Sequence, residues 1–400
     1  MVRPEGVEPP TSWSEATRSV QLSYGRFEDI ILQMSDIAAQ IESVEKEIRE
    51  TPYHKGTEHH IGKLRARLAR LRDRAGEQES RRAGGKGGGY AVRKQGDATV
   101  VLVGPPSAGK STLLNALTNA TSRIAPYAFT TMTVIPGMME YKNAKIQILD
   151  VPGLIEGAEE GKGRGREVLS VVRAADLIII MSDVSRPEAL DRITGILEKN
   201  GIRLNKKPPI VRTEKKLSGG IIVHSNVAQE LGRQTIKEVA TEMGIKNAEI
   251  FINERLDLER LIDAFARNRV YPPAVYVINK VDEAPRAHAR DMGLDFDDSS
   301  HRSFLIGAEK GTGLEELKNE IWRRLGFIVI YLTRTGERPN HDSPMIVKRE
   351  MTLSRIARQV GEEFAENKKR AKIWGSGAKF PGQEVSLSLP AKEGMMVRFV

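Results

Sequence analysis

An eight-residue stretch, Gly104–Ser111, constrains this chain more than any other feature. It has the sequence GPPSAGKS and matches the pattern G-x-x-x-x-G-K-[ST] of a phosphate-binding loop. The continuous apolar run Ala98–Val103 precedes it and predicts a parallel strand buried on both faces. A helix is predicted to follow at Thr112–Thr118. Because backbone N–H groups and a helix N-terminus attract anions, this arrangement predicts a nucleotide-binding site.

The same pattern assigns roles to individual residues. The Lys110 ammonium should reach the β- and γ-phosphates, and the Ser111 hydroxyl should bind Mg²⁺. The residues of this loop and helix start that we expect to contact the nucleotide are Ser107, Ala108, Gly109, Lys110, Ser111 and Thr112.

Strands and helices are predicted to alternate along the chain. Further apolar runs, with helical patterns between them, lie at Ile146–Leu149, Leu177–Met181 and Ala274–Ile278. This alternation predicts a doubly wound α/β sheet. From Asp150 to Asn279 the chain advances 279 − 150 = 129 residues, whereas two βαβ units of about 30 residues each need roughly half of that. We therefore expect a small α+β insert of about 60–70 residues near 200–270.

Two segments carry groups that can respond to a γ-phosphate. Asp150-Val-Pro-Gly153 follows a predicted strand, so Asp150 can hold the Mg²⁺ shell through water and the Gly153 N–H can approach the γ-phosphate. In Phe129-Thr-Thr-Met-Thr133, a hydroxyl can complete the Mg²⁺ shell only while the γ-phosphate is present. We favour Thr131 for this contact, with Phe129 and Thr130 beside the nucleotide. The candidate catalytic residues are Lys110, Thr131 and Gly153.

The segment Asn279-Lys-Val-Asp282 predicts selection of guanine. The Asp282 carboxylate can accept from both N1–H and N2–H₂ of guanine, whereas adenine would place an acceptor opposite it. An unpaired buried polar group costs about 1–3 kcal/mol, so the segment predicts preference for GTP and GDP. Asn279 should lie near N7, and the Lys280 stem should cover the base.

Positive charge is concentrated near the two ends of the chain. The net charge is 62 − 53 = +9. Residues 61–96 hold 11 basic and 3 acidic side chains, and residues 327–400 hold 13 and 8. Basic flanks indicate a polyanionic partner, with nucleic acid the first candidate; the alternative is a solvated basic surface. No feature predicts specificity for DNA.

Composition excludes several classes of protein. The 400 residues contain no cysteine, which excludes disulfides, thiolate zinc sites and cysteine nucleophiles. No apolar run approaches the ~20 residues that span a bilayer, and no signal-peptide core follows the start. We expect a cytoplasmic protein with no membrane partner.

The first 95 residues are predicted to form three segments. Residues 1–26 lack an apolar period and are expected to be a disordered extension. Apolar seams at residues 34–48 and 61–71 predict an antiparallel helical hairpin, with Thr57 capping its second helix. That second helix is basic and is either a solvated face or an RNA-facing arm. Gly84–Gly89 is interpreted as a flexible linker, because no strand precedes it.

The C-terminal residues 327–400 are predicted to be a separate small domain. A strand at Phe327–Leu332 is followed by a helix at Leu353–Val360 and by an alternating apolar pattern at 385–389. This order predicts a strand-rich domain built around one helix.

Together these motifs resemble the developmentally regulated GTP-binding protein (DRG) family of Obg-type translational GTPases, in particular its archaeal members. The resemblance covers about residues 27 to 400 and lies in Thr57-Glu-His-His60, the phosphate-binding loop, Phe129–Thr131, Asp150–Gly157 and Asn279–Asp282. It implies a helical hairpin and linker at 27–95, an OBG-type G domain at 96–326 and a TGS domain of β-grasp fold at 327–400. It also implies GTP hydrolysis as a switch in translation, with ribosome or RNA as partner and a protein regulator.

The sequence departs from the family pattern at two places. Gly307-Ala308 stands where Ser-Ala is usual, and the Ala308 N–H is expected to reach guanine O6. Gly361-Glu-Glu-Phe364 differs from the usual entry to the C-terminal module.

Two further residues bear on the rate of hydrolysis. Leu154 stands where many GTPases place a water-orienting glutamine, so intrinsic hydrolysis should be slow, about 10⁻³ s⁻¹. The resemblance implies that K⁺ replaces an arginine finger, although Ser107 stands where Asn usually accompanies that property.

Rival interpretations remain open at this stage. The chain could be a nucleotide-stabilised RNA- or ribosome-binding scaffold with incidental hydrolysis, or an ATPase. Other polar clusters are interpreted as surface or packing groups rather than metal sites; these are His54, His59 and His60, and Asp295, Asp297 and Asp298.

Overall fold

The computed structural model describes residues 37–82, 95–118, 125–126, 133–151, 164–266, 268–282, 303–334 and 336–400. The chain forms two compact units. The hairpin unit comprises Met1–Gly87 and Lys207–Arg269, and the sheet unit comprises Gly88–Lys206 and Val270–Val400. Predicted segments outside the described residues are 1–26, Gly84–Gly89, Phe129–Thr131, Gly153, Leu154 and the Asp295–Asp298 cluster.

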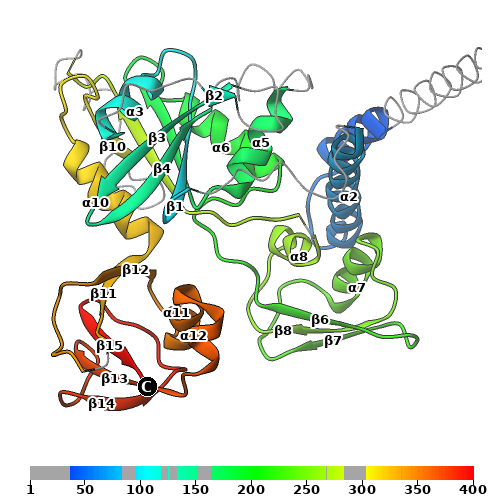
Figure 1. The fold of residues 1–400 in the computed structure, drawn as a ribbon. Coiled ribbons are helices and arrows are strands. Elements are labelled where there is room, and N and C mark those ends of the chain that lie inside the picture. Colours follow the sequence, from blue (N-terminus) through cyan, green and yellow to red (C-terminus); the bar gives the residue numbers. More distant parts are fainter. Residues whose placement is uncertain are drawn as a thin grey trace, which may run out of the picture. The chain divides into compact units, whose positions relative to one another are not determined.

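The sheet unit is built on a seven-stranded sheet with the order β10-β9-β5-β1-β4-β3-β2 (Figure 1). Five strands are parallel, namely β1 (Ala98–Val103), β4 (Ala144–Asp150), β5 (Leu177–Asp183), β9 (Ala274–Asn279) and β10 (Ser303–Leu305). The sequence predicted four of these as buried apolar runs. The parallel-dominated α/β fold is therefore confirmed.

One edge of this sheet was not predicted. Strand β3 (Thr133–Tyr141) runs antiparallel to β4, and the two-residue β2 (Ala125–Pro126) runs antiparallel to β3. Pro136 and Gly137 interrupt the apolar pattern of β3, which hid the strand in the sequence. The sheet is consequently mixed rather than wholly parallel.

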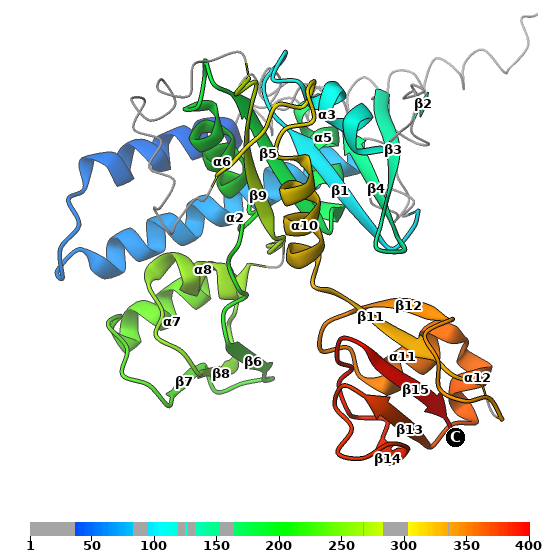
Figure 2. The same cartoon turned by 90° about the vertical axis from the view of Figure 1, so that its left-hand side faces the viewer.

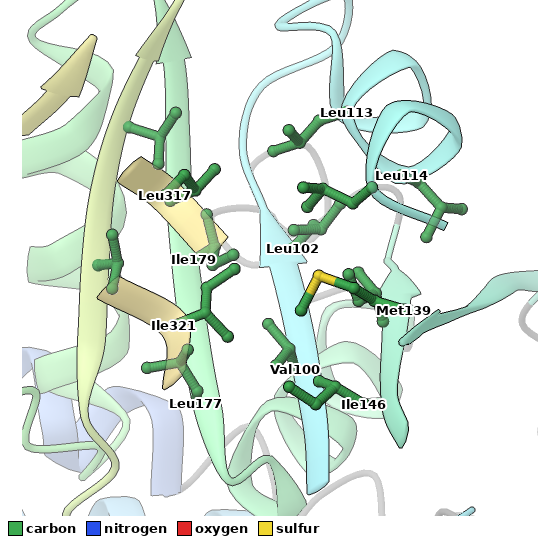
Figure 3. Close-up of a cluster of buried hydrophobic side chains, with 14 of the residues drawn as sticks. Val100, Leu102, Leu113, Leu114, Met139, Ile146, Leu177, Ile179, Leu317 and Ile321 are labelled. Atoms are coloured by element: carbon green, nitrogen blue, oxygen red, sulfur yellow. The ribbon is translucent and has the colours of Figure 1, made fainter. Parts of the chain in front are cut away.

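Helices cover both faces of the sheet. Helices α3 (Lys110–Thr118) and α10 (Leu314–Leu325) pack on one face, and α5 (Arg164–Ala174) and α6 (Ala189–Lys199) pack on the other. Along β1, Val100 and Leu102 join the first core whereas Val101 and Val103 join the second. Figure 3 shows Leu102 and Ile179 among the side chains of α3 and α10. The uninterrupted apolar runs thus reflect burial on both faces.

The hairpin unit contains two long helices and a small α+β insert. A helix at residues 37–50 and α2 (Glu58–Arg82) share a core of Val44, Leu64 and Leu71. The insert has a three-stranded sheet, ordered β6 (Val211–Lys215), β8 (Ala248–Ile252) and β7 (Ile221–Ser225). Helices α7 (Arg233–Glu242) and α8 (Leu258–Phe265) cover this sheet (Figure 2).

The turn between the two long helices differs from its prediction. The Thr57 hydroxyl accepts from the His54 N–H at 3.1 Å and donates to the Pro52 carbonyl oxygen at 2.7 Å. It therefore stabilises the turn, whereas a capping hydroxyl accepts from an N–H inside the helix. The buried Glu58 carboxylate accepts from the Gly232 N–H and the Thr235 hydroxyl, and so joins α2 to the insert.

Residues 327–400 form a five-stranded sheet with the order β12-β11-β15-β13-β14. Its strands are β11 (Phe327–Leu332), β12 (Pro344–Lys348), β13 (Arg370–Gly375), β14 (Gln383–Ser386) and β15 (Met395–Phe399). Only the β11–β15 pair is parallel. Helix α11 (Leu353–Val360) packs on the sheet through Leu353, Ile356 and Ala357, and the short α12 (Glu362–Glu366) follows it.

None of the described helices has the combination of length and apolar character that a membrane crossing requires.

The central strands should dominate the stability of the sheet unit. Ile179 has an exposed fraction of 0%, so Ile179→Ala should lower the free energy of unfolding by about 2–5 kcal/mol through lost burial and a residual cavity. The control Val360→Ala, at a residue of the same unit with an exposed fraction of 45%, should cost less than about 1 kcal/mol. Urea unfolding can be followed through the buried Trp322 in a background with Trp13→Phe and Trp374→Phe; equal losses would contradict this account.

Candidate functional site

The candidate site lies where four parallel strands end. Strand β1 leads into the phosphate-binding loop, and Asp150 at the end of β4 is the register partner of Leu102. At the ends of the next two strands, Asp183 is the register partner of Asn279. Because the carboxyl ends of parallel strands meet at one edge, residues far apart in sequence form one site there.

The backbone path of the phosphate-binding loop depends on two glycines, Gly104 and Gly109. Gly109 has a φ of +88°, and a Cβ there would lie 2.2 Å from Asn279 Nδ2. At Gly104 a Cβ would lie 2.4 Å from the Met181 carbonyl oxygen. Ser107, with a φ of 63°, adopts the left-handed region without being glycine. The two glycines of the pattern are thus required by close packing against β5 and β9.

Lys110 follows the loop and begins α3. Its ammonium donates to the carbonyl oxygens of Gly104 and Pro105, at 3.1 and 3.0 Å. The lysine thus joins the end of the loop to its start. Its predicted contact with the β- and γ-phosphates would be made from this position.

Ser111 and Asp150 form a pair of oxygen ligands. Ser111 Oγ donates to Asp150 Oδ2 at 2.6 Å. Asp150 is 4% exposed, and its Oδ1 atom is buried without a hydrogen-bond partner among the described residues. Carboxylate and hydroxyl oxygens are the ligands that Mg²⁺ takes. This pair therefore fits the predicted cation.

The Asn279 side chain joins two loops. Its Nδ2 donates to the Ala108 carbonyl oxygen of the phosphate-binding loop at 3.0 Å, and its Oδ1 accepts from the Ala308 N–H at 3.0 Å. The Ala308 N–H was predicted to reach guanine O6, but in the structure it donates to Asn279. The contact to O6 requires this N–H to be shared or released, and it stays a prediction together with the N7 contact.

Asp282 lies against the fifth loop. A Cβ at Gly307 would lie only 2.9 Å from the Asp282 carboxyl carbon. The absence of a side chain at Gly307 therefore gives the carboxylate room beside the loop backbone. The Asp282 side chain is 15% exposed, and Lys310 Nζ lies 3.7 Å from its Oδ2 atom. Lys280 has a φ of 64°.

A charged group at the end of β5, Asp183 with Arg186, was not predicted from the sequence. The Asp183 carboxylate accepts from Arg186 Nη2 at 2.8 Å and from the Ser185 N–H at 3.0 Å. Burial raises the pKa of Asp183, but these hydrogen bonds outweigh it and leave the pKa below its usual value. Arg186 Nη2 also donates to the Pro106 carbonyl oxygen at 3.0 Å. Polar residues directly after a buried strand were the signal that could have found this group.

Several predicted residues cannot be placed. Phe129, Thr130, Thr131 and Gly153 lie outside the described residues. Among the residues that the structure describes, no three His, Cys, Asp or Glu side chains gather as metal ligands. His60 instead pairs with Glu47, with 3.2 Å between Nε2 and Oε1.

Comparison with known proteins identifies the family of this site. A family model described as 50S ribosome-binding GTPase matches residues 99–215, and one for the C-terminal region of that domain matches residues 218–327. Human developmentally-regulated GTP-binding protein 2 is 38% identical over 354 residues, which cover 88% of this chain and 96% of that protein. The chain belongs to the developmentally regulated GTP-binding protein family.

A relative of higher sequence identity agrees with this assignment. An uncharacterized GTP-binding protein of Methanocaldococcus jannaschii is 43% identical to this DRG family member over 373 residues, 93% of this chain and 95% of that protein. Among solved structures, a GTP binding protein from Pyrococcus horikoshii covers 76% of this chain and 99% of its own, with a TM-score of 0.41 and 13% identity. The family models and the human relative show that the chain is a GTP-binding protein of the DRG family.

Asp282 should decide which purine the DRG site accepts. In Asp282→Asn an amide donor would face the guanine N1–H and N2–H₂ donors, but it would match the 2-carbonyl of xanthine. We expect GTP affinity to fall about 100-fold, with xanthosine triphosphate binding more tightly than GTP. Competition against fluorescent GDP measures both, and Glu309→Gln, which removes an exposed charge from the neighbouring fifth loop, is the control. An unchanged preference would remove Asp282 from base recognition.

Proposed function

We propose that this protein hydrolyses GTP to GDP and phosphate as a molecular switch that acts on the ribosome or on a translation-linked RNA in the cytoplasm. The observation that carries the proposal is the Ser111–Asp150 pair. It joins the hydroxyl at the end of the phosphate-binding loop to a buried carboxylate at the end of β4, whose Oδ1 atom has no hydrogen-bond partner among the described residues. A cation held there would neutralise the charge that develops on the phosphate oxygens in the transition state of hydrolysis.

The proposed mechanism assigns one task to each group. Lys110 neutralises charge that develops on the β- and γ-phosphates while water attacks the γ-phosphorus. Ser111, Thr131 and, through water, Asp150 would hold Mg²⁺, which would neutralise charge on the phosphate oxygens. The Gly153 N–H contacts the γ-phosphate. Loss of that phosphate releases Thr131, and this release is the switch.

The intrinsic rate is proposed to be slow. Leu154 has no polar group to orient the attacking water, so a rate of about 10⁻³ s⁻¹ is expected without help. A bound K⁺ or a protein regulator would supply the missing stabilisation of the transition state.

Hydrolysis can be tested without knowledge of the partner. Single-turnover GTP hydrolysis should rise at least about tenfold in K⁺ relative to Na⁺, or on addition of ribosomes. Ser111→Ala should abolish the stimulated rate and match the wild type in excess chelator, because both lack the bound Mg²⁺. Absence of stimulation by either K⁺ or ribosomes would favour the alternative, a nucleotide-stabilised scaffold with incidental hydrolysis. Equal binding of ATP and GTP would favour an ATPase.

An RNA partner is supported by the exposed face of α2. Lys63, Arg67 and Arg74 are exposed and spaced by four and seven residues, which places them on one side of the helix. They form no ion pair with a described residue, whereas Arg65, Arg70 and Arg72 pair with Glu259, Glu242 and Glu45. Unpaired cations in a line are suited to successive phosphates.

The C-terminal domain is proposed to be a TGS domain that contributes to the same contact. A mixed sheet packed on one helix is the arrangement expected of a β-grasp fold. An aromatic ring and a cation lie together on this sheet: the half-buried Arg398 packs on the half-buried Trp374, with 5.0 Å between the guanidinium carbon and the ring centre. Aromatic and arginine side chains stack with unpaired bases.

Salt dependence tests the α2 contact. Binding to ribosomes should weaken as salt rises, and a variant with Lys63→Gln, Arg67→Gln and Arg74→Gln should reduce the log–log slope by about 2 to 3. The control variant, Lys199→Gln with Arg233→Gln and Lys237→Gln, removes three exposed cations from other helices and should leave the slope unchanged. Equal slopes for all three proteins would exclude α2 from the interface. Measurements with GTP and with GDP test whether binding follows the switch.

A further inference from the structure

Four carbonyl oxygens of the phosphate-binding loop accept hydrogen bonds from side chains. When the N–H groups of such a loop surround phosphates, the carbonyl groups of the same trans peptides point away and need donors of their own. Lys110 donates to Gly104 and Pro105, and Asn279 donates to Ala108. The remaining bond, to the Pro106 carbonyl oxygen, comes from Arg186 at 3.0 Å.

Arg186 is held in place from β5. Its Nη2 atom makes both the 2.8 Å bond to Asp183 Oδ2 and the bond to Pro106. The Asp183 side chain is 3% exposed, and the Ser185 N–H and hydroxyl fix its other oxygen. The Val184 N–H donates to the Asn279 carbonyl oxygen at 3.2 Å, so the same segment is attached to the strand that carries the guanine motif.

This geometry favours a positional role over a direct role in catalysis. A guanidinium 2.8 Å from a buried carboxylate is largely neutralised, so it adds little net positive potential at the phosphates. Its hydrogen bond to a loop carbonyl, in contrast, directly restricts the orientation of the Pro106–Ser107 peptide. We propose that Arg186, aligned by Asp183, is a positioning residue that fixes the phosphate-binding loop in its nucleotide-binding shape.

The proposal has a specific kinetic consequence. The loop holds phosphates that are common to GDP, GTP and the transition state of hydrolysis. Loss of the bond should therefore weaken all three states equally, which raises KM and leaves kcat unchanged. An arginine that contacts the transferred γ-phosphoryl group would instead lower kcat and leave GDP affinity unchanged.

The experiment compares Arg186→Met with wild type in the full chain. Methionine keeps much of the side-chain volume but cannot donate, so the Kd values for GDP and GTP should both rise about tenfold, as expected for loss of one charge-assisted hydrogen bond. Saturated single-turnover rates should stay within about twofold. Arg186→Lys, which keeps a donor and the charge, should recover part of the affinity. Asp183→Asn should change affinity in the same direction as Arg186→Met.

A matched control exists in the same unit. Glu320 and Arg323, in the last turns of α10, are three residues apart like Asp183 and Arg186. The exposed Arg323 lies on the buried Glu320 carboxylate, with 2.6 Å between Nη2 and Oε1. Arg323→Met should leave both Kd values at the wild-type level. Urea unfolding of each variant, followed through Trp322, separates loss of the loop shape from loss of the fold.

Each remaining outcome overturns the proposal. If Arg186→Met binds GDP and GTP like the wild type, the bond to Pro106 has no positional role. If kcat falls while GDP affinity is unchanged, Arg186 acts on the γ-phosphate instead. The kcat measurement rests on the proposed hydrolysis, but the GDP measurement does not. A wild-type protein without hydrolysis would therefore refute the proposed function and leave the positional role testable.

Discussion

The two hydrogen bonds of the Asn279 side chain connect the part of the site that holds phosphates with the part that holds the base. One amide donates to Ala108 in the first loop and accepts from Ala308 in the fifth. Both bonds are buried, so loss of either would leave an unpaired polar group, at a cost of about 1–3 kcal/mol. Gly109 has to be glycine because a Cβ there would collide with this amide. The relative position of the two loops therefore depends on one side chain.

The fold was predictable where a strand is buried on both faces, because such a strand is a continuous apolar run in the sequence. The parallel strands β1, β4, β5 and β9 are continuous apolar runs, and their positions were predicted closely. Strand β3 was not, because Pro136 and Gly137 break its pattern and its pairing with β4 is decided by tertiary contact. Thr57 was misassigned for a related reason: a hydroxyl before a helix can cap it or stabilise the turn, and only the position of Pro52 decides.

The site residues also divide into those that a sequence motif predicts and those that only a tertiary contact places. Motif spacing gave Lys110, Ser111, Asp150 and Asn279, because the chemistry of phosphate, Mg²⁺ and guanine fixes residue types at fixed distances along the chain. Arg186 carries no such signature. Its role rests on a contact with a loop 80 residues earlier in the chain, and only the pairing of β5 with β1 brings the two together.

Pro105 and Pro106 explain why side chains from outside the loop have to donate to its carbonyl oxygens. Proline has no N–H, so two of the eight loop residues cannot donate to a phosphate. Proline also fixes φ near about −65°, which lowers the conformational entropy that the loop loses on ordering. A stiff loop with fewer N–H donors binds phosphates tightly only if its remaining N–H groups already point at the phosphates. A stiff loop cannot reorient an N–H group that points elsewhere, so that hydrogen bond is not made. Carbonyl contacts from Lys110, Asn279 and Arg186 supply that alignment before the nucleotide arrives.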